Sequence, residues 1–261
     1  MTNLKNVFSL LFQCLLLISS HSAFSAERNE TPIVIAVIEV GEPAAYKDAE
    51  NKPAGYLYDI SKSIVNQLDV PNSRVSLVPL RRVIHGLKNG DYHCAIMFAS
   101  KSREDTFIQV AKIMNKNLVI VRRLDSDFPV AKIEDLEGLK VGYLRGAFFL
   151  NQKGFLSLEN TAKYPVGDSK NGLSMLNAGR IDAFIGTRDF MDKHYSSNLT
   201  YSSLSTQESM LQCSKNSTAL TPNLIVKLKR IIDDLHKKNI IFNIIRRYRP
   251  FYVRNNGGKT L

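Results

Sequence analysis

Short apolar runs alternate with amphipathic stretches along most of the chain, and this alternation limits the possible folds more than any other feature. Residues 33–38 and 94–98 are nearly continuous apolar runs of strand length, which is typical of strands buried on both faces. Residues 58–68 instead place their apolar side chains at helical spacing. Strands that alternate with helices in this way predict mostly parallel sheets of the α/β class.

The alternation begins again after a polar connector that follows Arg123. The other predicted strands cover residues 75–78, 118–121, 139–144, 181–185 and 209–213, and the other predicted helices cover residues 81–88, 169–176, 188–194, 224–235 and 240–248. No sequence period of ~20–50 residues recurs, which argues against a solenoid. We therefore predict two α/β lobes.

The N-terminus has the composition of an export signal. Lys5 precedes an apolar run over residues 7–18, and small residues follow up to Ala26. A charged start, a short apolar core and small residues predict a signal peptide over residues 1–25 and a periplasmic location. The alternative is a membrane anchor, but the run is shorter than the ~20 residues that a spanning helix needs.

The chain carries a formal net charge of +11, and 44% of its residues are hydrophobic and 23% charged. This composition is typical of a folded globular protein. The basic excess favours anionic partners or ligands, although a solvated basic surface is the simpler interpretation. Export, and the lack of a motif that combines aromatic and basic side chains, argue against nucleic acid as a partner.

Cys94 and Cys213 are the cysteines that remain after signal cleavage. In an oxidising compartment they form either a disulfide or, since both lie in apolar runs, two buried thiols. The histidines show no ligand-like spacing with one another or with these cysteines, so we predict no metal site and no cofactor. The sequence has no nucleophile-elbow or phosphate-loop motif, so an enzyme is the less favoured function.

Several weakly specific segments follow one another along the chain. They cover residues 43–46 with 54–60, 86–92, 100–103, 133–142, 176–183 and 213–216. None is specific alone. Together, and in this order, they resemble the bacterial extracellular solute-binding proteins of family 3, the type that serves ABC transporters for polar amino acids. The resemblance covers nearly the whole chain after the signal peptide.

This resemblance implies the two-lobed periplasmic binding protein fold of type II, with a two-strand hinge. Lobe 1 would comprise residues 26–118 and 214–261, and lobe 2 residues 124–209. The hinge would comprise residues 119–123 and 210–213. The resemblance also implies a monomer that closes on a small-molecule ligand, because a ligand that bridges two lobes stabilises the closed form.

Arg103 is the first candidate for the ligand anchor, because Ser100–Arg103 resembles the Ser/Thr-x-x-Arg anchor of the family. A guanidinium can hold a carboxylate through two parallel hydrogen bonds, and Ser100 can add a hydroxyl. Both residues follow the predicted strand that ends at Phe98, and open α/β sheets bind ligands at the carboxyl ends of strands. The alternative is a surface arginine paired with Glu104 or Asp105.

Other candidate ligand contacts come from both predicted lobes. Tyr46 would supply an aromatic wall or, alternatively, pack over the first strand. Glu42 would meet an amine or hydroxyl of the ligand or, alternatively, remain a solvated carboxylate. Gly146, Ala147 and Phe148 lie where a predicted strand turns into a helix, and the free backbone N–H groups of such a turn suit an anion.

Thr187 departs from the family pattern, because amino-acid binders usually place an acidic residue at this position to take the ammonium group of the ligand. Arg188 follows Thr187, and Asp189 comes two residues late. Arg103 with Arg188 would suit a dicarboxylate or another organic anion better than an α-amino acid. We expect delivery of the ligand to an ABC transporter permease; the alternative is a sensing subunit for a membrane receptor.

Overall fold

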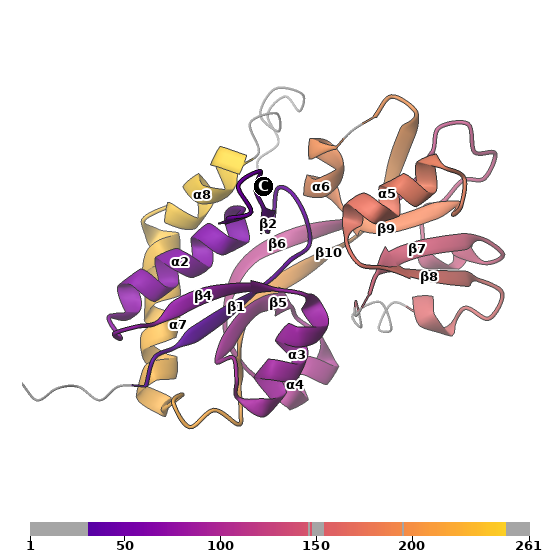
Figure 1. Ribbon diagram of the computed structural model, residues 1–261. Coiled ribbons are helices and arrows are strands. Elements are labelled where there is room, and N and C mark those ends of the chain that lie inside the picture. Colours follow the sequence, from indigo (N-terminus) through magenta and orange to yellow (C-terminus); the bar gives the residue numbers. More distant parts are fainter. Residues whose placement is uncertain (1–30, 146, 148–153, 195, 249–261) are drawn as a thin grey trace, which may run out of the picture. The chain divides into compact units, whose positions relative to one another are not determined.

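The structure is a computed structural model that describes residues 31–145, 147, 154–194 and 196–248. One eight-stranded sheet organises this part of the chain, with the strand order β4-β1-β5-β10-β6-β9-β7-β8 (Figure 1). Its strands are β1 (Val34–Ile38), β4 (Arg74–Val78), β5 (Cys94–Phe98), β6 (Phe107–Arg123), β7 (Lys140–Leu144), β8 (Ala162–Val166), β9 (Ala183–Thr187) and β10 (Leu199–Ser214). A small hairpin pairs β2 (Tyr46–Lys47) with β3 (Pro53–Ala54).

Helices cover both faces of this sheet. The α-helices are α2 (Tyr56–Leu68), α3 (Leu80–Asn89), α4 (Lys101–Thr106), α5 (Ser169–Asn177), α6 (Arg188–Lys193), α7 (Pro222–Lys237) and α8 (Ile240–Tyr248), and the 3-10 turns are η1 (Ile133–Leu136) and η3 (Phe155–Ser157). The α/β class predicted from the alternating pattern is therefore confirmed. No helix in the described ranges is long and apolar enough to cross a membrane.

The first half of the sheet is β4-β1-β5, in which β1 runs parallel to both neighbours. Successive side chains of a strand point to opposite faces. Ile35 and Val37 accordingly pack with α2, α7 and α8, whereas Ala36 and Ile38 pack with α3. A strand with cores on both faces must be apolar throughout, and this explains the continuous run at residues 33–38.

The second half is β9-β7-β8, which is again parallel. It repeats the two-faced arrangement with its own cores. Leu118 and Ile120 of β6 pack with the η1 turn, whereas Val119 and Val121 pack against α5 and α6. The apolar cores of the two halves thus contain different stretches of the same strand, and the protein has the two-lobed architecture that the sequence predicts.

Strands β6 and β10 run antiparallel beside each other and pass through both halves. The predicted strands at residues 118–121 and 209–213 were too short. Between the two halves the strands carry polar residues, such as the segment 115–117, so their apolar pattern is interrupted although their pairing is not. β10 pairs with β5 from residue 209 onwards, and β9 pairs with β6 from residue 118 onwards.

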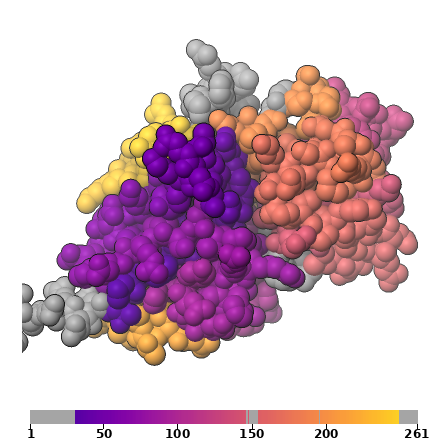
Figure 2. Space-filling view, viewed as in Figure 1, coloured from indigo at the N-terminus to yellow at the C-terminus, as the bar shows by residue number. Residues whose placement is uncertain are grey.

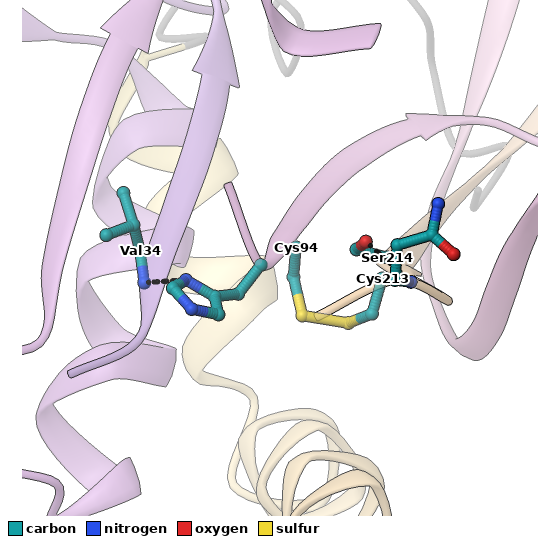
Figure 3. Close-up of a disulfide and its surroundings, with 6 residues drawn as sticks. Val34, Cys94, Cys213 and Ser214 are labelled. Carbon is teal, nitrogen blue, oxygen red and sulfur yellow. Dashed lines mark hydrogen bonds between the residues drawn. A yellow bond between two sulfur atoms is a disulfide. The ribbon is translucent and has the colours of Figure 1, made fainter. Parts of the chain in front are cut away.

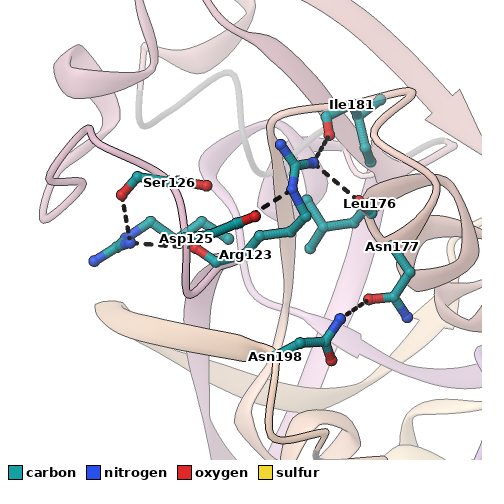
Figure 4. Close-up of polar contacts among 8 residues, drawn as sticks. Arg123, Asp125, Ser126, Leu176, Asn177, Ile181 and Asn198 are labelled. Atoms are coloured by element: carbon teal, nitrogen blue, oxygen red, sulfur yellow. Dashed lines mark hydrogen bonds and ion pairs between the residues drawn. The ribbon is translucent and has the colours of Figure 1, made fainter.

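Arg123, at the end of β6, is held within the second half. Its Nη1 donates hydrogen bonds to the carbonyl oxygens of Leu176 at 3.1 Å and Ile181 at 3.3 Å, and its Nε lies 3.5 Å from a carboxylate oxygen of Asp125 (Figure 4). These bonds tie the end of the crossing strand to the turn between α5 and β9.

A disulfide joins Cys94 of β5 to Cys213 of β10, where the two residues lie opposite each other in the antiparallel pair (Figure 3). The sequence had left open a disulfide or two buried thiols. Beside it, His93 is buried, and its Nδ1 accepts a hydrogen bond from the backbone N–H of Val34 at 2.9 Å. The disulfide links an early and a late segment of the chain within the first half.

Helix α2 begins at a position that only glycine fits. Gly55 has a φ of 112°, and a Cβ added there would lie 2.4 Å from the carbonyl oxygen of Ala44. The backbone of this turn therefore approaches the loop after β1 closely. This contact fixes the direction in which Tyr56, the first residue of α2, leaves the turn.

Candidate functional site

A cavity lies between the two halves of the sheet and is lined by residues of both. Ile38, Glu42 and Leu57 contribute from the first half, and Thr187 and Phe190 contribute from the second. The space among the lining residues, including its opening to solvent, is about 780 Å³. Its walls are mainly apolar, which suits a ligand with an apolar body and a few polar groups. Figure 2 shows the two halves in contact on one face, the first in indigo and purple and the second in salmon.

An ion pair is buried at this cavity. The Nζ of Lys116, which is among the lining side chains, lies 3.2 Å from Oδ2 of Asp189, and the two side chains are 5% and 3% exposed. The hydroxyl of Tyr56 donates a hydrogen bond to the same carboxylate oxygen. The Lys116 ammonium also lies 5.3 Å from the centre of the Tyr56 ring, within the range of a cation–π contact.

These three residues come from different parts of the fold. Tyr56 begins α2 in the first half, Lys116 lies in the crossing stretch of β6, and Asp189 lies in the first turn of α6 in the second half. Buried charges require such mutual partners, because each alone would lose its hydration without compensation. The cluster therefore connects the two halves through buried polar contacts.

A second set of contacts crosses the cavity at its edge. The Nζ of Lys193 on α6 lies 3.8 Å from Oε2 of Glu42, and both side chains are partly exposed. The ring of Phe190 approaches Gly41, and the ring of His194 lies against it with centroids 4.4 Å apart. Burial lowers the pKa of His194. These contacts place α6 against the loop that follows β1.

Arg103 is buried, with 6% of its surface exposed. Its Nη1 donates a hydrogen bond to the carbonyl oxygen of Phe98 at 2.7 Å, and burial lowers its pKa to about 10, so it remains a cation at neutral pH. No carboxylate in the described ranges forms an ion pair with this guanidinium. Arg103 does not itself line the cavity, but it is hydrogen-bonded to Phe98, which does.

Glu42, Phe98, Ala147 and Thr187 are the predicted contacts that the structure brings together at the cavity. Gly146 and Phe148 lie outside the described residues.

The remaining predicted contacts do not line the cavity. The hydroxyl of buried Ser100 lies 3.3 Å from that of Ser102, and half-buried Tyr46 lies in the β2–β3 hairpin. Arg188 faces Asp192, with Nε and Oδ2 3.7 Å apart.

Sequence reasoning missed Lys116 and set Asp189 aside as too late in the chain. The structure places Lys116 inside the long strand β6, but the predicted strand began only at residue 118, so the pattern did not mark Lys116 as a buried charge. Its partner lies far along the chain, so the sequence alone could not supply it. No group of three or more His, Cys, Asp or Glu residues in the described part of the chain is placed to hold a metal ion.

The sequence profile of the bacterial extracellular solute-binding proteins, family 3, matches residues 33–250. The chain belongs to this family. The predicted family is thereby confirmed, and the match spans both halves of the sheet and the two C-terminal helices.

Solved structures of solute-binding proteins share the fold. A crystal structure of a mutant of ArgBP from T. maritima is 20% identical, with a TM-score of 0.71, over 84% of this chain and 95% of that one. AbpA from Streptococcus pneumoniae, an amino acid ABC transporter substrate-binding protein bound to L-arginine, is 18% identical, with a TM-score of 0.69, over 83% and 94% of the two chains. An ancestral arginine-binding protein bound to glutamine is 17% identical, with a TM-score of 0.70, over 83% and 97%.

The comparison with curated proteins gives no match. The similarity to the solved structures therefore supports the fold of this solute-binding protein, and its ligand has to be inferred from its own residues. In this chain the cavity has mainly apolar walls and the buried ion pair of Lys116 and Asp189. The buried Arg103 is hydrogen-bonded to Phe98, one of the lining residues.

Proposed function

We propose that this solute-binding protein captures a small, carboxylate-bearing ligand in the cavity between its lobes and delivers it to an ABC transporter in the membrane. The observation that carries the proposal is the cavity itself, because Glu42 and Leu57 of one half and Thr187 and Phe190 of the other line the same space. A ligand there touches both halves at once. Such a ligand stabilises the closed form by its higher affinity for it.

Arg103 supports a carboxylate as the polar group of that ligand. It is a buried cation with one hydrogen-bonded nitrogen and no ion pair to a described carboxylate. A carboxylate that reached it would form charge-assisted hydrogen bonds in a desolvated site. We propose that, on binding, Arg103 breaks its hydrogen bond to the Phe98 carbonyl and donates to the ligand carboxylate instead. The Ser100 hydroxyl is proposed to donate to the same carboxylate.

Thr187 and Ala147 line the cavity from the second half of the sheet, and we propose that they contact the ligand from that side. The Thr187 hydroxyl supplies a hydrogen bond without charge. Arg188 begins α6 next to Thr187, and we propose that its charge favours an anion at this end of the cavity.

The lobe and hinge boundaries stay predictions. The pairing pattern supports a bend within residues 115–117 of β6 and 206–208 of β10, which lie opposite each other. There the two strands pair with each other, whereas β5 and β9 pair with them on either side of this stretch. A ribbon of two strands has fewer hydrogen bonds to resist bending than the wider sheet at its ends. We propose that closure uses this stretch.

The cellular context follows from the family, whose members are extracellular solute-binding proteins. We propose that residues 1–25 are a cleaved signal peptide, that the mature protein is a periplasmic monomer, and that it is not an enzyme. The partner is proposed to be a transporter permease, with a membrane receptor as the alternative. N-terminal sequencing of the exported protein tests the cleavage site, and affinity capture with purified permease tests the partner.

The ligand itself is tested by thermal denaturation and isothermal titration calorimetry with amino acids, organic acids and simple cations. The proposal predicts a saturable rise in melting temperature with at least one small carboxylate. Tight binding of a cation that lacks a carboxylate, with no response to any carboxylate, would falsify it.

A further inference from the structure

The carboxylates at the cavity are already matched with cations of the chain itself. Glu42 is the acidic residue among the described lining residues, and Lys193 lies 3.8 Å from it. Asp189 lies just behind the wall and is held by Lys116 and by the hydroxyl of Tyr56. A ligand with an ammonium group would need one of these carboxylates as its partner.

The group of Lys116 that pairs with Asp189 is a primary ammonium, as is the amino group of an amino-acid ligand. This ammonium is buried 3.2 Å from the carboxylate and near the face of the Tyr56 ring. A carboxylate and an aromatic face are together a favourable environment for an ammonium ion. Lys116 reaches this position from the strand that crosses between the halves, so the group is covalently attached.

We propose that Lys116 is a specificity-determining residue: its built-in ammonium makes the cavity select small carboxylates that carry no ammonium group and reject α-amino acids. This inference rests on the proposed function, which supplies the carboxylate ligand. An amino acid would place a second cation beside Lys116 in a desolvated site whose buried carboxylate, Asp189, is already paired with Lys116. Juxtaposed like charges of this kind are a common source of discrimination between ligands.

The test compares matched pairs of ligands that differ in the ammonium group alone. L-leucine, L-phenylalanine and L-glutamate are each titrated calorimetrically against the 2-hydroxy acid with the same side chain, in which a hydroxyl replaces the ammonium. Wild-type protein should bind at least one 2-hydroxy acid on the order of tenfold or more tighter than its amino-acid partner.

The variants Lys116→Met and Lys116→Gln assign that preference to the ammonium of Lys116. Both should lose it by on the order of tenfold or more, because the buried ammonium that opposes a ligand ammonium is then gone. Lys112→Met is the matched control, since Lys112 lies on the same strand but is 44% exposed and paired with Glu208. It should keep the wild-type preference. Thermal denaturation confirms that each variant is folded.

Each outcome decides between the claims. If wild-type protein binds amino acids as well as or better than the 2-hydroxy acids, the inference about Lys116 is overturned while the proposed binding function stands. Folded Lys116 variants with an unchanged preference overturn it as well. If wild-type protein binds neither class, the proposed carboxylate ligand fails, and the inference fails with it. The wild-type comparison is decisive even if neither Lys116 variant folds.

Discussion

The ammonium of Lys116 and the carboxylate of Asp189 form an ion pair with N and O atoms 3.2 Å apart and both side chains buried. The pair joins the crossing strand β6 to helix α6, and Tyr56 extends it to helix α2. Polar contacts therefore hold the two halves together at the same place where the cavity lies. This arrangement affects both the stability of the protein and its choice of ligand.

The first prediction concerns stability. Lys116→Met should lower the free energy of unfolding by about 3–5 kcal/mol, because it removes a cation that pairs with the buried Asp189 carboxylate. The double variant Lys116→Met with Asp189→Leu should recover most of this loss, since neither charge of the buried pair remains. Urea denaturation followed by circular dichroism measures both. A double variant no more stable than the single one would show that the pair does not act as a unit.

The second prediction concerns the ligand anchor. Arg103→Ala should abolish the ligand-induced rise in melting temperature, because it removes the buried cation proposed to take the carboxylate. The apo protein should lose about 1.5–3 kcal/mol for the charge-assisted hydrogen bond to the Phe98 carbonyl, plus a packing loss. Arg81→Ala is the control, since Arg81 is an exposed arginine of α3. Normal binding by the Arg103 variant would show that the anchor is elsewhere.

The third prediction concerns the disulfide. Replacing Cys94 and Cys213 together by alanine should lower the free energy of unfolding by about 2–4 kcal/mol, because the bond closes a long loop in the unfolded chain. The sequence separation of the two cysteines is 119 residues. Wild-type protein unfolded in the presence of dithiothreitol should show a similar loss. An equal stability of oxidised and reduced protein would contradict this role.

The fourth prediction concerns acid stability. Burial, and then the charge of Arg74, lower the pKa of His93 below 6.5. The unfolded chain therefore binds more protons just below pH 6.5 than the folded protein. The stability contributed by neutral His93 is present above about pH 6.5 and is lost as the pH falls through the lowered pKa.

Denaturation at several pH values between neutral and acidic measures this effect. His93→Asn keeps a hydrogen-bond acceptor near the Val34 N–H but does not titrate, so its stability should fall less steeply with decreasing pH. His85→Asn, at an exposed position of α3, is the control. A His93 variant as acid-sensitive as wild type would mean that another group, such as half-buried His194, determines the slope.

The helices and short strands could be predicted from the sequence wherever their hydrophobic pattern was unambiguous. Residues 94–98 and 240–248 coincide with β5 and α8, because a strand with a core on each face is continuously apolar and a surface helix carries one apolar stripe. Strands β6 and β10 were underestimated, because their middle parts leave one apolar core before entering the next. A hydrophobic pattern shows which residues are buried in a core. The middle parts of β6 and β10 pair with each other without entering a core, so this pattern does not reveal them.

The site was less predictable than the fold, because it depends on contacts between distant segments. Phe98 and Thr187 end strands β5 and β9 and line the cavity, in keeping with the rule that α/β sheets bind ligands at the carboxyl ends of strands. Tyr46 lies in the β2–β3 hairpin and does not line the cavity, and its contact with a ligand stays a prediction. Lys116 and Asp189 explain each other only when β6 and α6 are side by side, and nothing local in the sequence specifies that proximity.

A crystal structure of the mature protein with its tightest-binding small carboxylate tests the central claim most directly. We expect ligand density in the cavity, in contact with Glu42 or Leu57 of one half and with Thr187 or Phe190 of the other, and with the carboxylate bound by Arg103. Ligand density confined to one half, or located outside this cavity, would contradict it.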